Sequence, residues 1–272
     1  MPELPEVEFA RRSLLRWFEG RRVVRAEAES GARTFRGSDP AAFSRIRGAL
    51  TSAKRRGKYL LLAFEQGQGV LAHLGMTGKF VRRPKGQQEP YSKARWFLED
   101  GTVVHFRDPR MFGRIEVVPA DALPTLEVVR GLGVDPLEDG LTGPRLRDRL
   151  ERSGQDLKVA LMDQSRVAGL GNIHAAEALF RAGIHPSRKP GTLAPEEWRR
   201  LARSILQSIQ FALDHEDDDE EIEYVEEGGE NPFLVYGRSG KPCVRCGTAV
   251  KSFTQAGRTT HFCPGCQLKK PY

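Results

Sequence analysis

The residues Cys243-Val-Arg-Cys246 and Cys263-Pro-Gly-Cys266 contain all four cysteines of the 272-residue chain, spaced C-x2-C-x16-C-x2-C. This spacing is typical of zinc ribbons, because thiolates bind Zn²⁺ in closed tetrahedral sites. The segments Val250–Thr254 and Thr259–Phe262 between the pairs predict a hairpin that turns at Ala256-Gly257. Two disulfides fit the same count, but a chain with no other cysteine favours the metal. We therefore expect one structural Zn²⁺, which folds a segment too short to bury its own core.

Arg258 directly follows the expected turn of this hairpin. A guanidinium held on a rigid two-stranded ribbon can enter a groove or bind a phosphate. A surface arginine on a turn is by itself usually only solvated, so its role depends on the rest of the chain.

Four helices are expected before the ribbon, over 144–153, 157–164, 173–182 and 195–214. Residues 119–143 are rich in Pro and Gly and predict a linker. Residues 21–118 read as strands, and Asp100-Gly101 is a hairpin signal between two of them. A helix over 2–20 is expected to pack on these strands. The predicted fold is α+β with a β-sandwich domain (1–118), the linker (119–143), a helical domain (144–230) and a zinc-binding hairpin domain (231–272).

The charge is unevenly distributed. Residues 214–230 contain eleven acids, and no Lys or Arg occurs between Arg203 and Arg238. The whole chain carries +7, so without these acids the rest carries +18. Such a basic body indicates a polyanionic partner, most often nucleic acid, although a merely soluble basic protein fits too. The acidic stretch itself has the composition of a solvated loop.

No apolar run approaches the roughly 18 residues of a membrane span, and no signal peptide is evident. We therefore expect a cytoplasmic protein without membrane contact.

The N-terminus Met1-Pro2-Glu3 contains groups that could take part in catalysis. Excision of Met1 would leave Pro2 with a free secondary amine, and an α-amino group has a pKa near about 8. This amine could attack an aldehyde-level carbon and form an iminium, as lysines do in Schiff bases. Glu3 is placed for proton transfer. Taken alone, the same residues could simply begin a helix.

Several motifs occur together in a fixed order, and with them the chain closely resembles the bacterial formamidopyrimidine-DNA glycosylases from residue 1 to about 267. They are Met1-Pro2-Glu3-Leu4-Pro5-Glu6-Val7-Glu8, Arg56-Gly57-Lys58-Tyr59-Leu60, His73-Leu74-Gly75-Met76-Thr77-Gly78, Asp108-Pro109-Arg110-Met111-Phe112-Gly113, Val167-Ala168-Gly169-Leu170-Gly171-Asn172-Ile173 and Val235-Tyr236-Gly237-Arg238, followed by the cysteine ribbon. The resemblance implies an N-terminal β-sandwich, a helix–two-turn–helix domain and a zinc finger, with DNA crossing between domains.

The resemblance also implies the chemistry. Pro2 would attack the deoxyribose C1′ and displace the damaged base, Glu3 would move protons at the sugar, and β,δ-elimination would cut the strand. Lys58 and Arg258 would hold phosphates beside the lesion and so belong with the catalytic residues. The enzyme would act in base excision repair on double-stranded DNA with oxidised bases or abasic sites, as a monomer and with no cofactor beyond zinc.

The remaining implied residues contact DNA. Met76, Arg110 and Phe112 would fill the hole left by the flipped nucleotide, since Met is adaptable, Phe can wedge between bases and Arg can bond the widowed base. Core packing is the alternative for Met76 and Phe112. The other implied contacts are Lys158, Asn172 and Tyr236.

The chain departs from the family pattern most clearly at residues 215–232, where relatives have a Gly-rich loop that closes over everted 8-oxoguanine. The acidic stretch stands there, so we expect slower excision of 8-oxoguanine than of formamidopyrimidines. His174 and Met111 are smaller departures. Two alternatives stay open: an endonuclease VIII-like preference for oxidised pyrimidines, against which Leu4 argues, and a non-catalytic zinc-ribbon protein that binds damaged DNA.

Overall fold

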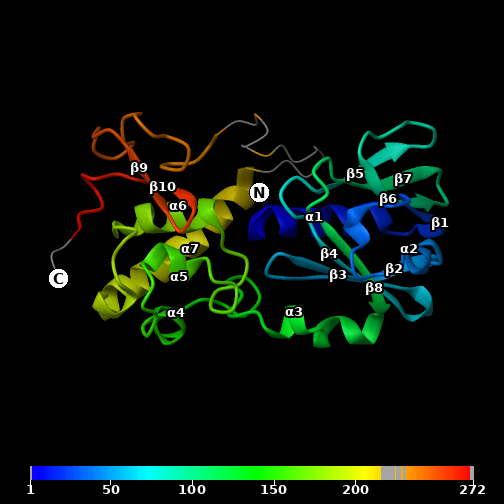
Figure 1. Ribbon diagram of the computed structural model, residues 1–272, viewed down its shortest axis with the longest axis horizontal. Helices are drawn as coiled ribbons and strands as arrows, with labels where there is room; N and C mark the ends of the chain where they lie inside the picture. Colours follow the sequence, from blue (N-terminus) through cyan, green and yellow to red (C-terminus); the bar gives the residue numbers. More distant parts are fainter. Residues whose placement is uncertain (1, 216–223, 225–227, 229–230, 270–272) are drawn as a thin grey trace. The chain divides into compact units, whose positions relative to one another are not determined.

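The computed structural model describes residues 2–215, 224, 228 and 231–269, which form two compact units (Figure 1). The first unit contains residues 2–131 with Tyr224 and Gly228. The second contains residues 132–215 and 231–269.

The first unit is an antiparallel β-sandwich with helix α1 (Leu4–Phe18) packed into it. Its strands are β1 (Arg22–Ala28), β2 (Gly48–Arg56), β3 (Tyr59–Phe64), β4 (Gln68–His73), β5 (Lys79–Pro84), β6 (Ser92–Leu98), β7 (Thr102–Arg107) and β8 (Arg114–Pro119). They are hydrogen-bonded in the order β5-β7-β6-β1-β2-β3-β4-β8. The pairing between β1 and β2 is short and joins two residue pairs among the described residues. The sheet therefore divides between these two strands into two four-stranded layers.

The core of this unit lies between the two layers. Alternate residues of each strand point inward, as a half-buried strand requires, and Trp96 of one layer and Leu62 of the other are both at most 1% exposed. Helix α1 adds Val7 and Leu14 at helical spacing. The predicted helix, sandwich and Asp100-Gly101 hairpin are confirmed.

Short helices complete the first unit: η1 (Arg33–Phe35), α2 (Pro40–Ser44), η2 (Glu65–Gly67), η3 (Ala120–Thr125) and α3 (Glu127–Arg130). The last two lie within the stretch predicted as a linker. Leu123 and Val129 in this stretch cluster with Leu61 and Leu71, which point away from the main core. The sequence does not predict this packing, because the apolar residues of the stretch are interspersed with Pro and Gly residues that are typical of a linker.

The second unit combines helices with the C-terminal hairpin. Its elements are α4 (Gly143–Leu150), α5 (Leu157–Leu161), α6 (Asn172–Ala182), η4 (Pro190–Thr192), α7 (Pro195–His215), β9 (Lys251–Gln255) and β10 (Arg258–Phe262). All four predicted helices are present, within a few residues of the expected bounds. The ribbon attaches to α6 through a cluster that joins Ala176 and Phe180 to Val250 and the buried cysteines.

The acidic stretch predicted as a solvated loop lies outside the described residues, apart from Asp214 and His215 at the end of α7, Tyr224 and Gly228. Tyr224 is 4% exposed and packs against Phe9. Its hydroxyl donates a hydrogen bond to the Gly78 carbonyl at 2.7 Å. This tyrosine therefore belongs to the first unit, although it lies far along the chain from residues 2–131.

Among the described residues, no helix combines the length and the apolar character that crossing a bilayer would require.

Candidate functional site

Pro2 and Glu3 lie together at the beginning of α1. Pro2 is buried and Glu3 is 1% exposed. The Glu3 carboxylate accepts a hydrogen bond from the Glu6 backbone N–H, and the Glu6 carboxylate accepts one from the Glu3 N–H at 2.7 Å. This capping box satisfies two N–H groups at the start of the helix and fixes the Glu3 carboxylate on the first turn of α1, directly after Pro2 in the chain.

Lys58 lies in the two-residue turn Gly57-Lys58 between β2 and β3. The fully buried Arg55 side chain connects this turn to α1: it donates to the Gly57 carbonyl at 3.1 Å and to Glu8 at 3.3 Å. Burial would raise the pKa of Glu8, but hydrogen bonds and charge from Arg11, together with the Arg55 charge, lower it below its ordinary value. The ion pair thus holds the Lys58 turn against the helix that begins beside Pro2.

A row of three residues crosses the end of the sheet near this turn. Tyr59 of β3 pairs with His73 of β4, which pairs with Arg114 of β8. Burial, together with the charges of Lys58 and Arg114, lowers the pKa of His73 to about 4. Because the ring is neutral near pH 7, its Nδ1 can accept the Gly75 N–H at 3.0 Å and hold the loop that follows β4.

We expect this unit to lose stability as the pH falls from 6.5 towards 4. His73 and His105 both have a pKa lowered to about 4, mainly by burial, so in this window the unfolded chain binds protons that the folded chain does not. Each should cost roughly 1–2 kcal/mol at pH 5, where most carboxylates stay ionised. Urea unfolding at pH 7 and pH 5 measures the loss, which His105→Asn should reduce. An equal free energy of unfolding at both pH values would contradict the prediction.

The expected void-filling side chains extend from two loops. One loop joins β4 to β5 and the other joins β7 to β8. Phe112 is 51% exposed, Met76 is 37% exposed and Arg110 is exposed, with its guanidinium 5.1 Å from the centre of the Phe112 ring. Side chains that pack in a protein core are buried, so the exposure of Met76 and Phe112 contradicts the core-packing alternative for them.

A buried carboxylate that the sequence analysis missed joins these two loops. Asp108 is 0% exposed, and it accepts hydrogen bonds from the Thr77 hydroxyl at 3.0 Å and the Gly113 N–H at 2.7 Å. The loops also touch at Gly75, where a Cβ would lie 2.4 Å from the Phe112 carbonyl carbon and where φ is +69°. Only glycine fits this contact.

Replacing Asp108 with Asn is expected to lower kcat/KM on a lesion-containing duplex by roughly 5- to 30-fold. The amide can still accept the Gly113 N–H and can donate to the Thr77 hydroxyl, but two charge-assisted hydrogen bonds become neutral ones, which costs about 1–2 kcal/mol. Borohydride trapping on single-stranded abasic DNA needs no void filling and should be retained. Asp100→Asn, which alters a turn carboxylate at the β6–β7 hairpin, is the control. Equal losses on both DNA substrates would contradict a positioning role.

In the second unit, the start of α6 meets the C-terminal hairpin. The Asn172 amide donates to the Thr259 carbonyl at 3.1 Å, and its oxygen accepts from Lys158 Nζ. Arg258, next to Thr259, is exposed and follows the Ala256-Gly257 turn, so the hairpin prediction is confirmed. The structure therefore brings Asn172 and Arg258 together.

Lys158 lies inside this unit, although the resemblance implies a DNA contact for it. It is 0% exposed, and besides Asn172 its amine donates to the Thr260 hydroxyl at 2.9 Å. In this position Lys158 supports both the Asn172 amide and the hairpin.

Tyr236 is held by a second buried carboxylate that the sequence analysis missed. Glu177 of α6 is 0% exposed and accepts the backbone N–H groups of Leu234, Val235 and Tyr236 at 2.8 to 3.1 Å. The Tyr236 ring then lies edge-on to His261 of the hairpin, with ring centres 5.2 Å apart.

The four cysteines form one cluster, with their sulfur atoms all within 4.8 Å of one another. The Cys243–Cys266 and Cys246–Cys263 sulfur distances are 3.8 and 3.5 Å. All four cysteines are free of disulfide bonds, which need about 2.05 Å, and the two distances fit the edge of a tetrahedron with Zn–S bonds of about 2.3 Å. The donor set therefore fits one structural Zn²⁺.

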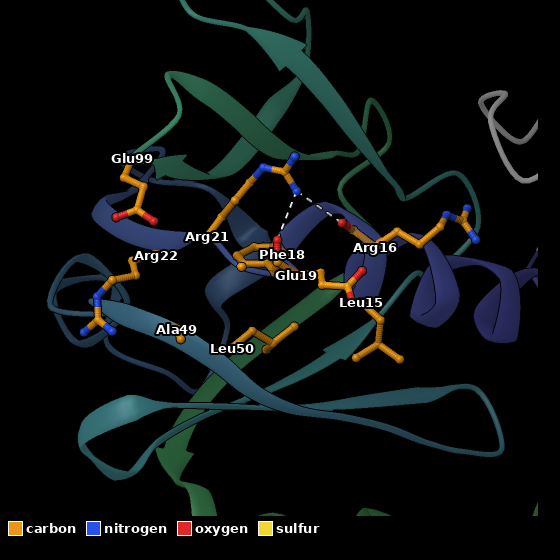
Figure 2. Close-up of a pocket in the computed structure, with 10 residues that line it drawn as sticks. Leu15, Arg16, Phe18, Glu19, Arg21, Arg22, Ala49, Leu50 and Glu99 are labelled. Atoms are coloured by element: carbon orange, nitrogen blue, oxygen red, sulfur yellow. Dashed lines mark hydrogen bonds between the residues drawn. The ribbon is translucent and has the colours of Figure 1, made fainter.

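A hollow of about 680 Å³ lies at the C-terminal end of α1 (Figure 2). Its Arg21 donates to the carbonyls of Arg16 and Glu19 and pairs with Asp100, so it neutralises the negative end of the helix. Helix α1 has 15 residues, which places this hollow roughly 20 Å from Pro2. We therefore assign it a structural role.

Three family models match the chain. The formamidopyrimidine-DNA glycosylase N-terminal domain matches residues 1–115, the formamidopyrimidine-DNA glycosylase H2TH domain matches 132–222, and a zinc finger found in FPG and IleRS matches 240–268.

Full-length relatives support the same conclusion. A formamidopyrimidine-DNA glycosylase of Pelotomaculum thermopropionicum is 38% identical over 279 residues, covering 99% of this chain and 100% of the relative. The Lactococcus lactis Fpg, solved with Fapy-dG DNA, is 29% identical with a TM-score of 0.87, covering 98% of this chain and 100% of that one. A MutM solved with carbocyclic 8-oxo-G DNA is 30% identical with a TM-score of 0.86 at the same coverage.

Proposed function

This chain belongs to the formamidopyrimidine-DNA glycosylase family, and we propose that Pro2 is the nucleophile with which it excises oxidised purines from double-stranded DNA. It is a bifunctional DNA glycosylase and AP lyase. The observation that supports the assignment of Pro2 is the capping box, which ties the carboxylate of its chain neighbour Glu3 to the first turn of α1. Excision of Met1 would free that nitrogen as a secondary amine.

The proposed reaction begins with attack of the Pro2 nitrogen on C1′ of the damaged nucleoside. The glycosidic bond breaks, and the base leaves with the bonding electrons and takes up a proton. The Pro2 nitrogen then loses its proton, and the C1′–O4′ bond opens with a proton delivered to O4′, which leaves an iminium between Pro2 and C1′. Glu3 handles protons at the sugar. The iminium acidifies the C2′ hydrogen, so β- and then δ-elimination release the two flanking phosphates, and hydrolysis frees Pro2.

The other site residues hold DNA. Met76, Arg110 and Phe112 fill the hole left by the everted nucleotide. Lys58, Asn172 and Arg258 grip phosphates beside the lesion, and Tyr236 contributes a further contact. Lys158 acts through Asn172, which it holds by hydrogen bonding while remaining buried.

The four cysteines Cys243, Cys246, Cys263 and Cys266 would hold one Zn²⁺, whose chemistry here is structural cross-linking. With all four positions taken by thiolates, the metal fixes the hairpin that carries Arg258. We place the protein in the cytoplasm with the nucleoid, where its DNA substrate lies.

Within this activity we propose that formamidopyrimidines and abasic sites are processed faster than 8-oxoguanine. The sequence of residues 214–230 supports this order, because eleven carboxylates repel DNA phosphates and suit a lid over a neutral base poorly. The described part of the stretch is linked to the void-filling loop, since Tyr224 bonds the Gly78 carbonyl two residues from Met76.

Single-turnover excision rates on matched duplexes test both proposals. The duplexes carry a formamidopyrimidine, 8-oxoguanine or an abasic site, and are compared at two salt concentrations. A variant with residues 215–230 replaced by Gly and Ser, but with Tyr224 kept, should recover rate on 8-oxoguanine. Tyr224→Phe, which removes only the bond to Gly78, is the matched control. Faster excision of 8-oxoguanine than of formamidopyrimidine by the intact protein would refute the order. Binding without excision or trapping would indicate a non-catalytic DNA-binding protein.

A further inference from the structure

A groove of about 510 Å³ lies beside Phe112 in the first unit. It is lined by Arg33, Arg36, Gly37, Phe112, Gly113 and Arg114. None of these arginines is among the phosphate-holding residues assigned above. The groove therefore needs an explanation of its own.

The groove concentrates positive charge with little to neutralise it. Arg33 and Arg36 are exposed, and neither forms an ion pair within the part of the chain that the structure describes. Arg114 pairs with Glu116 at 2.6 Å through Nη2, while its Nε is buried with no hydrogen-bond partner among the described residues. Three guanidiniums share one carboxylate here, and their mutual repulsion favours binding of an anion.

The groove is also connected to the loop between β7 and β8, which carries Arg110 and Phe112 and is called the wedge loop below. Arg36 Nη2 donates to the Met111 carbonyl at 3.5 Å and its Nε to the Arg33 carbonyl at 3.2 Å. Met111 lies between Arg110 and Phe112, so the Arg36 side chain bridges from η1 to the wedge loop. Arg36 is exposed and lines the groove, so the guanidinium donors that these two bonds do not use remain available to a phosphate.

We propose that this groove binds a backbone phosphate of the undamaged strand, next to the base opposite the lesion. This inference rests on the proposed function, in which Phe112 enters the duplex and Arg110 meets the widowed base. That base belongs to the undamaged strand, so the phosphates nearest the wedge loop on its side belong to that strand as well. An open groove lined by charged side chains suits a phosphodiester better than an enclosed small molecule.

Such a contact anchors the duplex without touching the reacting nucleotide. Its loss should weaken binding and leave the rate at saturating enzyme unchanged. This separates it from Pro2 and Glu3, whose loss should affect the rate.

The test compares the Arg33→Gln/Arg36→Gln double variant with the wild type as zinc-loaded full-length protein. Affinity is measured from 50 to 200 mM salt on a duplex with a tetrahydrofuran abasic analogue. We expect roughly tenfold weaker binding, and a plot of log K against log salt that is shallower by about 0.9, the contribution of one phosphate. Arg25→Gln removes one of the two units of charge that the double variant loses, from an exposed arginine that pairs with Glu27, and should have little effect.

Neutral methylphosphonate linkages then assign the strand. A methylphosphonate at one position near the base opposite the lesion should weaken binding by the wild type but should not further weaken binding by the double variant. Coupling on the lesion strand instead, or a salt slope equal to that of Arg25→Gln, would overturn the proposal. Competition by inorganic phosphate at micromolar concentration would indicate a small-anion site and also overturn it. Borohydride trapping on single-stranded abasic DNA runs in parallel: failure of the wild type there rejects the proposed function, while the binding data still decide the groove.

Discussion

An N-terminal extension of one residue before Pro2, chosen so that it is not cleaved off, is expected to abolish borohydride trapping on abasic-site DNA. The added residue turns the Pro2 nitrogen into an amide, whose lone pair is delocalised and no longer nucleophilic. Pro2→Gly should slow trapping without abolishing it, because a primary amine remains. The measurement is the fraction of protein cross-linked to labelled DNA per unit time, with mass spectrometry to verify the N-terminus of each preparation.

Two controls make the Pro2 experiment decisive. DNA binding by the extended protein should be near wild type if the extra residue is small, so a loss of trapping reports chemistry. Lys58→Met removes the nearest alternative amine in the proposed site and should leave a trappable, if slower, enzyme. If the extended protein cross-links normally and Lys58→Met does not, Lys58 is the nucleophile and the assignment of Pro2 is wrong.

The second large effect is expected from Cys263→Ser, which should lose Zn²⁺ and weaken DNA binding by roughly a hundredfold or more. Cys263 is 0% exposed and belongs to the apolar cluster that attaches the ribbon to α6, so its loss affects both the metal and the packing. Without the ribbon, Arg258 and Asn172 lose their fixed geometry, and two charge-assisted phosphate contacts are each worth about 1.5–3 kcal/mol.

The first unit should survive this substitution, because its core contains no residue of the ribbon. Limited proteolysis should release a stable fragment that ends near residue 131, and metal analysis should show no zinc. Arg258→Gln is the matched control, since it removes a proposed phosphate contact while keeping all four zinc ligands. A Cys263→Ser protein with no zinc and full DNA affinity would contradict the role given to the ribbon.

The sequence predicts those elements whose signals are local. Asp100-Gly101 marks a hairpin because its turn chemistry needs only neighbouring residues, and the two cysteine pairs mark the metal site because their spacing reflects ligand geometry. Helix α1 follows from apolar residues at helical spacing that lead up to Gly20.

Residues whose partners lie far along the chain could not be predicted from the sequence. Asp108, Glu177 and Arg55 look like ordinary surface charges in a sequence, but each is buried against donors or acceptors that folding brings to it. Burial of a single charge leaves no periodic signal, whereas burial of a helix face does. For the same reason, the sequence gives no sign that Lys158 faces the interior.

The buried carboxylate of Glu177 and the buried amine of Lys158 both depend on partners that the ribosome synthesises later. Glu177 bonds N–H groups 57 to 59 residues later in the chain, and Lys158 bonds Thr260, which is 102 residues later. A ribosome that adds about 5–20 residues per second needs roughly 5–20 s to cross the longer interval. During that time the nascent second unit carries two charges whose distant partners do not yet exist, while the first unit can already close its core. Chains that stall before the last cysteine pair should therefore be recognised as unfinished and degraded from that half.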